Sequence, residues 1–418
     1  MSLSITNLPI LIFCIFTCFA RLSMVTFRED NEINCYIAMT GEHKIVTLLI
    51  VYFSLISLYS IPGNANEWQE QKIQQALFEM YNLNNVAAHQ HFKEVLNSQP
   101  FHPLAPMAEL ATDWLKNQEE LGYQEGNRIL ASRIDSVLAI YHDKLKANPQ
   151  NGELEFYYGC TYGLKARLSL GEKDYLGVLI NGYNAVRYIK AAERHQPDFI
   201  ELQIPFGVFN YYVGISRGYM QIASWIMNTS GSKEEGLAQM RYAAHNARYS
   251  CYEARSILAM VTLYFEGDYE STLYYAEMMA SDFPNNPYYN YLAGEALIQM
   301  GRYAEAEKQI KRIKQLLPKL KPKTQKEYWS KLHQLQGSLA LKKGDLATAE
   351  KELRAVIDNY DQEMDVQLGF ALLRLGNVYD LTGRRELAVQ CYQRAYGLKN
   401  RSQACQLAKL YLKTPYTQ

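Results

Sequence analysis

The protein has 418 residues, 48% of them hydrophobic, and its 43 lysines and arginines balance 43 aspartates and glutamates. A chain of this length exceeds a typical single domain, so it forms either two domains or one extended repeat array. The balanced charge leaves no net field that would attract nucleic acid or an anionic membrane surface.

The N-terminal region carries the pattern of a secretory signal. Two weakly basic residues at 43–44 precede an apolar run from Ile45 to Ile61, and a Gly-Asn-Ala sequence ends the segment at Ala65. Met39 lies just before this pattern. We therefore expect a signal peptide at residues 39–65 that is cleaved after Ala65, and a protein exported to the periplasm or outer envelope of a bacterium.

Two alternatives stay open for this N-terminal segment, residues 1–65. Residues 45–61 are slightly shorter than the roughly 20 apolar residues that cross a bilayer, so they could stay uncleaved as a membrane anchor. They could also form a membrane hairpin with the apolar residues 8–20. With the signal beginning at Met39, we expect translation to start there, which makes residues 1–38 an over-long gene prediction.

Four of the seven cysteines lie after the expected signal: Cys160, Cys251, Cys391 and Cys405. An even number of cysteines in an exported chain permits disulfides. Cys391 and Cys405 are close enough in sequence to pair, but none of the four belongs to a C-x-x-C motif. Buried free thiols are the preferred interpretation, and a bond between Cys391 and Cys405 stays open.

Residues 265–284 recur at 299–318 with an offset of 34 residues. A glycine, a tyrosine and a proline recur in the same order: Gly267, Tyr269 and Pro284, then Gly301, Tyr303 and Pro318. Glycines seven residues apart mark three successive units: Gly294 with Gly301, Gly337 with Gly344, and Gly376 with Gly383. Ala388 follows the last pair. This period and this order of small residues resemble the tetratricopeptide repeat family.

The resemblance implies an all-α fold, a right-handed superhelical solenoid of antiparallel helix pairs. In this family, the first glycine of each pair lies where the two helices of a repeat cross, and Ala388 occupies the facing position on the second helix. The second glycine of each pair, like Gly267, ends the first helix in a tight turn that suits a positive φ. One helix pair cannot bury its apolar face alone, so neighbouring pairs stack.

We expect three parts after the N-terminal segment. Residues 66–250 carry a thinner pattern and should form degenerate helical pairs with insertions, residues 251–400 the more regular units, and residues 401–418 a capping helix and tail. The basic segment 319–329 should be an extended connection. Residues 204–240 resemble a helical-pair unit of bacterial tetratricopeptide proteins that are related to a eukaryotic family involved in inclusion-body clearance.

The sequence lacks three common enzyme motifs, since it contains no G-x-x-x-x-G-K-[ST], H-E-x-x-H or C-x-x-C pattern. The spacing G-x-S-x-G occurs once, at residues 214–218. We therefore expect no catalysis, no cofactor and no metal site. A further alternative is an enzyme whose site lies in the irregular region 200–235, although no cluster of ionisable residues supports it.

Binding is the function that the resemblance implies. In this family, four positions of each first helix line the concave surface of the solenoid. In the regular units these positions include Tyr288, Tyr291, Glu295, Lys331, Gln334, Phe370, Asn377 and Asp380. The lysine with which chaperone-binding members hold a peptide carboxylate is absent at the matching positions. The mixed lining suits an extended peptide or a helix of another protein, unless these side chains merely pack the inner layer.

These observations predict a non-catalytic scaffold or adaptor of the bacterial envelope, which binds another protein and no nucleic acid. The alternative is a membrane-anchored assembly factor that associates with the membrane through residues 45–61. The two hypotheses differ in whether that segment remains in the mature protein.

Overall fold

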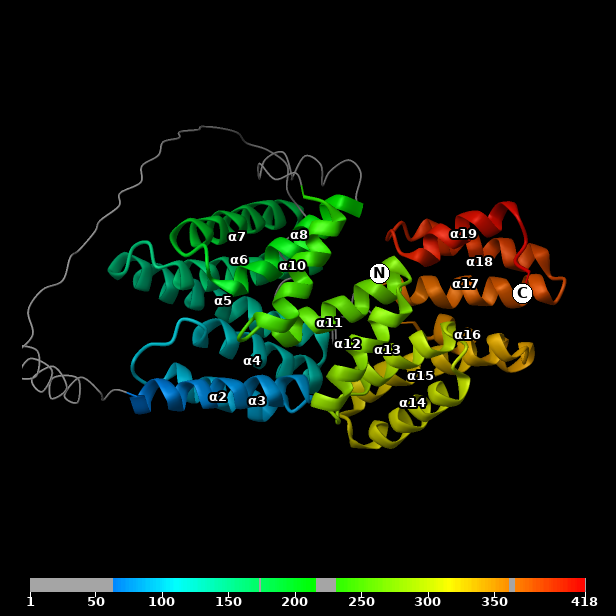
Figure 1. The fold of residues 1–418 in the computed structure, drawn as a ribbon, viewed down its shortest axis with the longest axis horizontal. Helices are drawn as coiled ribbons and strands as arrows, with labels where there is room; N and C mark the ends of the chain where they lie inside the picture. The colour runs from blue at the N-terminus through cyan, green and yellow to red at the C-terminus, as the bar shows by residue number, and fades with distance from the viewer. Residues whose placement is uncertain (1–62, 173, 216–230, 361–364, 418) are drawn as a thin grey trace, which may run out of the picture.

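In a computed structural model, the described residues are 63–172, 174–215, 231–360 and 365–417 (Figure 1). Across these ranges the chain forms seventeen α-helices and no β-strand, and nearly every helix packs on the helices that precede and follow it. The protein is therefore an all-α solenoid of helix pairs, which confirms the predicted fold class.

The first half of the chain forms the helices on the left of Figure 1. They are α2 (Gly63–Tyr81), α3 (Asn85–Leu96), α4 (Ala105–Leu121), α5 (Tyr123–Ala147), α6 (Gly152–Gly171), α7 (Tyr175–His195), the 3₁₀ turn η1 (Ile200–Leu202), α8 (Gln203–Ile215) and α10 (Lys233–Asn246). Ser232 caps α10, because its hydroxyl accepts a hydrogen bond from the Glu235 amide at 3.0 Å.

The second half of the chain runs from the centre to the right of Figure 1. Its elements are α11 (Cys251–Val261), the π-helical turn η2 (Thr262–Glu266), α12 (Tyr269–Asp282), α13 (Pro287–Gln299), α14 (Tyr303–Leu316), the 3₁₀ turn η3 (Leu317–Lys319), α15 (Pro322–Lys343), α16 (Leu346–Asp358), α17 (Val366–Leu381), α18 (Arg385–Gly397) and α19 (Gln403–Lys413). The last helix packs against both helices of the final pair.

The prediction of an extended connection at 319–329 was wrong. Helix α15 begins at Pro322, so most of this segment is helical. Proline is well accommodated in the first turn of a helix, where its missing amide hydrogen has no intrahelical partner to lose. The basic residues therefore start a long helix instead of separating two repeats.

The expected signal peptide and the apolar runs at 8–20 and 45–61 lie outside the described residues. Helix α2 begins at Gly63, so the expected cleavage point after Ala65 falls in its first turn. In the described part of the chain, no helix combines the length and the apolar character needed to cross a bilayer.

The first helix of the structure packs against a distant part of the chain. The Tyr81 hydroxyl at the end of α2 donates to Glu253 on α11 at 2.8 Å, and the Asn286 side chain donates to the Tyr81 carbonyl at 2.8 Å. The Tyr81 ring also contacts Phe283, with 5.4 Å between the ring centroids. These contacts join the N-terminal pairs directly to the repeats at 251–400.

The four described cysteines that follow residue 65 are all free thiols. Cys391 and Cys405 are both buried, and no bond joins them. The Cys405 sulfur instead lies 3.1 Å from both the Ala395 carbonyl oxygen and the Asn400 side-chain oxygen.

Four glycines end first helices in the left-handed conformation. Their φ values are 68° at Gly267, 75° at Gly301, 81° at Gly344 and 73° at Gly383. A side chain at this φ brings Cβ close to the following carbonyl oxygen, which is why glycine suits the position. The first glycine of each pair has a different role: a Cβ on Gly376 would lie 2.4 Å from the Tyr392 ring, and one on Gly337 would lie 2.8 Å from Leu353.

Replacing Gly383 with alanine is expected to lower the free energy of unfolding by about 1–2 kcal/mol, the cost of the left-handed conformation. No atom lies within 4 Å of a Cβ at this position, so steric overlap contributes nothing. Asparagine tolerates this conformation better, so Gly383→Asn should cost less than Gly383→Ala. Urea unfolding followed by circular dichroism measures both, and equal losses for the two variants would contradict a conformational cause.

Candidate binding groove

The residues predicted to line a groove come from the first helices of three successive pairs. Tyr288, Tyr291 and Glu295 lie on α13, Lys331 and Gln334 on α15, and Phe370, Asn377 and Asp380 on α17. All three helices contact one another, although α14 and α16 separate them in sequence. The structure therefore brings the eight residues onto adjoining helices of one layer.

Seven of the eight residues are buried, all except Asp380. Five of them, Tyr288, Tyr291, Glu295, Lys331 and Gln334, expose no more than 5% of their surface, while Phe370 and Asn377 expose 8% and 7%. Tyr264, in the turn η2 that follows α11, contacts two of the predicted residues. Its hydroxyl lies 2.9 Å from the Tyr291 hydroxyl, and its ring centroid lies 5.4 Å from the Phe370 ring centroid. Burial and the nearby Tyr264 raise the pKa of the Tyr291 hydroxyl. These five side chains pack the inner layer and leave little surface for a partner.

The remaining predicted residues lie at the other end of the layer, beside an open cavity of about 100 Å³. Phe370 and Asn377 line this cavity. The full lining consists of Tyr269, Gln299, Ser338, Leu341, Lys342, Phe370, Leu373, Arg374, Asn377, Gln403, Leu407, Tyr411 and Tyr416. We call this cavity the C-terminal groove. Its walls come from α12, α13, α15, α17, α19 and the tail that follows α19.

A buried ion pair lies beside the C-terminal groove. The Arg374 guanidinium donates two hydrogen bonds to the Glu295 carboxylate, at 2.9 and 2.6 Å. The side chains of both residues are less than a tenth exposed. Ser338 also lies within hydrogen-bond distance of Glu295, at 3.4 Å. The pair crosses from α17 to α13 and so ties non-consecutive helices together.

Sequence reasoning missed Arg374 because it does not occupy one of the four expected groove positions. The sequence did offer one indication that Arg374 is unusual, because it is the single charged residue in the apolar sequence GFALLRLG of α17. A charged residue on such a helix is seldom buried without an opposite charge. That rule predicts a partner for Arg374 but does not identify Glu295.

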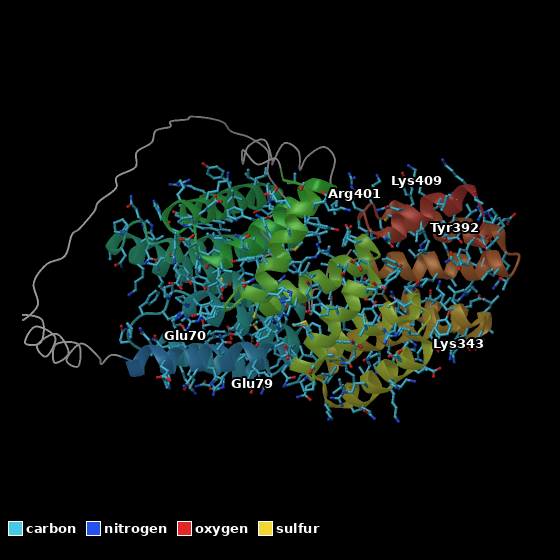
Figure 2. All side chains as sticks on the ribbon, in the orientation of Figure 1. Glu70, Glu79, Lys343, Tyr392, Arg401 and Lys409 are labelled. Carbon is cyan, nitrogen blue, oxygen red and sulfur yellow. The ribbon has the colours of Figure 1, made fainter. Side chains whose placement is uncertain are left out.

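The rim of the groove is closed by the C-terminal tail. Asp380 accepts a hydrogen bond from the Tyr416 amide at 2.8 Å and pairs with Arg385 at 3.0 Å. The Tyr392 hydroxyl lies 2.9 Å from Asp380 and 3.0 Å from Asn377; Figure 2 labels Tyr392 on α18. Asp380 therefore holds the tail at the end of α17 and does not face the open groove.

Of the region 200–235, considered above as an enzyme site, residues 216–230 lie outside the described residues. The described part contributes a buried carboxylate with a structural role. Glu201 accepts hydrogen bonds from the amides of Arg248, Tyr249 and Ser250, at 2.8, 2.9 and 3.0 Å. These amides lie immediately before α11, where a negative charge stabilises the helix. A cavity of about 40 Å³ beside Glu201 is lined mainly by apolar side chains. Within the described residues, no group of three metal-ligating side chains gathers here or elsewhere.

The half-buried side chain of Glu153, which is affected by the charge of Glu201, leads us to predict that the stability of the protein depends on pH. Burial, followed by the charges of Glu70 and Glu201, raises the pKa of Glu153, while Arg248 opposes the shift. The folded protein then holds a proton that the unfolded chain releases, so stability falls as the pH rises above the unfolded pKa of about 4.3. Glu153→Gln should therefore unfold at higher urea concentration than wild type at pH 7 and at the same concentration below about pH 4. An equal difference in unfolding midpoint between the variant and wild type at both pH values would contradict a raised pKa of Glu153 as the cause.

The comparisons with known proteins agree with the glycine spacing. Residues 263–334 and 371–401 each match a family model described as a tetratricopeptide repeat. The chain carries tetratricopeptide repeats. The first matched segment runs from η2 into α15, and the second covers most of α17 together with α18. Five residues of the C-terminal groove lie within these segments: Tyr269, Gln299, Leu373, Arg374 and Asn377.

One solved structure that is similar to this chain is a tetratricopeptide repeat protein from Parabacteroides merdae ATCC 43184. The two are 13% identical, and the match covers 74% of this chain and 99% of that chain, with a TM-score of 0.31. No curated protein matches the chain. Tetratricopeptide repeats in general mediate protein–protein interaction and are non-catalytic, and such arrays commonly bind through an extended concave surface.

Proposed function

We propose that the protein is a non-catalytic scaffold or adaptor that holds an extended segment of a partner protein in the C-terminal groove. The observation that carries this proposal is the open cavity of about 100 Å³, whose walls come from α12, from the first helices α13, α15 and α17, and from α19 with the tail that follows it. Its lining combines apolar, aromatic and polar side chains. An extended segment offers a matching series of side chains and backbone groups.

The other end of the inner layer does not support binding. There, the predicted positions Tyr288, Tyr291 and Gln334 are at most 4% exposed, so a partner would have to displace packed side chains. The groove proposal is accordingly limited to the side chains that line the cavity around Phe370 and Asn377, including Gln299 at the end of α13.

Photocrosslinking in the cells that make the protein tests this proposal. The photoreactive residue p-benzoylphenylalanine would replace Gln299, which lines the groove, or Lys308, which is exposed on α14. We expect the Gln299 variant to form covalent adducts that mass spectrometry maps to one segment of one protein. The Lys308 variant should not form that adduct. Identical adducts from both positions, or none from Gln299, would overturn groove binding.

The proposal includes export from a bacterial cytoplasm, supported by the basic, apolar and small residues in order at 43–65. Expression from Met1 and from Met39 with a C-terminal tag, followed by mass spectrometry of the mature N-terminus, tests it. A chain that begins at Asn66 in a soluble envelope fraction is expected. An intact chain that resists alkaline extraction from membranes would instead favour the membrane-anchored assembly factor.

A further inference from the structure

The charges around the C-terminal groove do not balance. Its lining contains two cations, Lys342 and Arg374, and no carboxylate. Arg374 already has an anionic partner, because it donates two hydrogen bonds to the Glu295 carboxylate. Lys342 has no such partner, since no described carboxylate forms an ion pair with it. One positive charge therefore remains in the groove.

The surroundings of Lys342 make this charge costly in the free protein. Burial, followed by the positive charge of Arg374, lowers the pKa of the Lys342 ammonium. A cation in such a place gains more from an arriving anion than a solvated lysine does, because low-dielectric walls strengthen the attraction.

The next residue shows the contrast within one helix. Lys343 is exposed, as its label at the periphery of Figure 2 shows, and forms an ion pair with Glu307 on α14. Both lysines lie in the last turn of α15, so both interact with the same end of the helix dipole. Lys342 alone faces the groove.

Other groups around Lys342 suit a polypeptide. Gln299 and Gln403 line the groove, and their side-chain amides form no hydrogen bond within the described part of the chain. Phe370, Leu407 and Tyr411 provide apolar and aromatic area on the same surface. The backbone of a peptide can form hydrogen bonds with the two glutamine side-chain amides. An apolar side chain next to an acidic one can pack against the aromatic rings.

We infer that the C-terminal groove selects partner segments that carry an aspartate or glutamate side chain, which pairs with Lys342 beside an apolar residue. This inference rests on the proposed function and adds the chemistry by which the groove distinguishes one segment from another. The contact is made by one carboxylate with one ammonium group, because Arg374 is already engaged by Glu295.

Selection from a library of short random peptides tests this inference. The peptides are displayed with both ends fused to a carrier, so that no free C-terminal carboxylate is present, and are selected on the purified full chain. We expect enrichment of acidic residues next to apolar ones. Lys342→Glu should lose this preference and select basic peptides, whereas Lys343→Glu should keep the wild-type preference. An acidic peptide selected on wild type should bind Lys342→Met about tenfold more weakly, the loss expected for a partly buried charge contact.

The outcomes separate the two proposals. Selected peptides that crosslink at Gln299 but show no acidic preference would overturn the role of Lys342 and leave groove binding intact. No peptide crosslinked at Gln299 would overturn groove binding itself. A second library presents the same peptides with free C-termini. If only this library gave binders, the groove would recognise a terminal carboxylate, and the inference that it recognises an acidic side chain would be overturned. An acidic preference that Lys342→Glu and Lys343→Glu lose equally would also overturn the inference.

Discussion

Replacing Arg374 with alanine is expected to lower the free energy of unfolding by about 3–5 kcal/mol. The substitution leaves the Glu295 carboxylate 1% exposed and without its two hydrogen bonds, which were 2.9 and 2.6 Å long. A buried charge that loses its partner cannot regain the hydration that it gave up on folding. Urea unfolding measures the loss, and hydrogen exchange should show increased opening of α13 and α17, the helices that the pair connects.

A double variant separates the contribution of the Arg374–Glu295 ion pair to stability from the cost of leaving the Glu295 carboxylate buried without a partner. Glu295→Met with Arg374→Met replaces both charges by apolar side chains, so it should recover most of the stability that Arg374→Ala loses. Lys146 provides the control, because its ion pair with Asp143 is exposed and Lys146→Ala should cost about 0–1 kcal/mol. A loss below about 1 kcal/mol for Arg374→Ala would show that water reaches Glu295.

The fold of the second half could be predicted because its signals are local. Turns at Gly301, Gly344 and Gly383 need a positive φ, and the crossing at Gly376 needs the absence of a side chain. Each requirement involves only a few neighbouring residues, so each is visible in the sequence as a glycine at a fixed position within its repeat. The segment at 319–329 shows the limit of such reasoning, since Pro322 is compatible with both a break and a helix start.

The groove could be predicted only in part, because exposure depends on contacts between distant residues. The periodic positions include Phe370 and Asn377, which line the cavity. The same positions include Tyr291, which is fully buried because Tyr264 reaches it from another repeat. No periodic pattern within one repeat contains that contact. Whether a partner binds at these positions stays a prediction.

Lys342 illustrates why charge alone was uninformative in the sequence. It is one of two adjacent lysines in a chain with balanced charge. Only the positions of Glu307 and Arg374 distinguish them, because the first neutralises Lys343 and the second neighbours Lys342. The unpaired member of the two was visible only after helices α14, α15 and α17 were placed together.

Replacing Gly236 with alanine is expected to destabilise the protein by about 3 kcal/mol, the upper end of the usual cost of overpacking. A Cβ at this position would lie 2.3 Å from the Tyr211 amide nitrogen and 2.5 Å from the Gly207 carbonyl oxygen. Both are backbone atoms of α8, so no side-chain rotation can relieve the overlap, and α8 and α10 must separate.

Gly397 is the matched control for this loss. It also lies in a helix, α18, but no atom lies within 4 Å of a Cβ there. Alanine loses less backbone entropy than glycine on entering a helix, so Gly397→Ala should raise the free energy of unfolding by about 0.5 kcal/mol. The same substitution thus changes stability in opposite directions, and urea unfolding of the two variants measures the difference. If both variants shifted the midpoint equally, the close approach of α8 and α10 would not be present in solution.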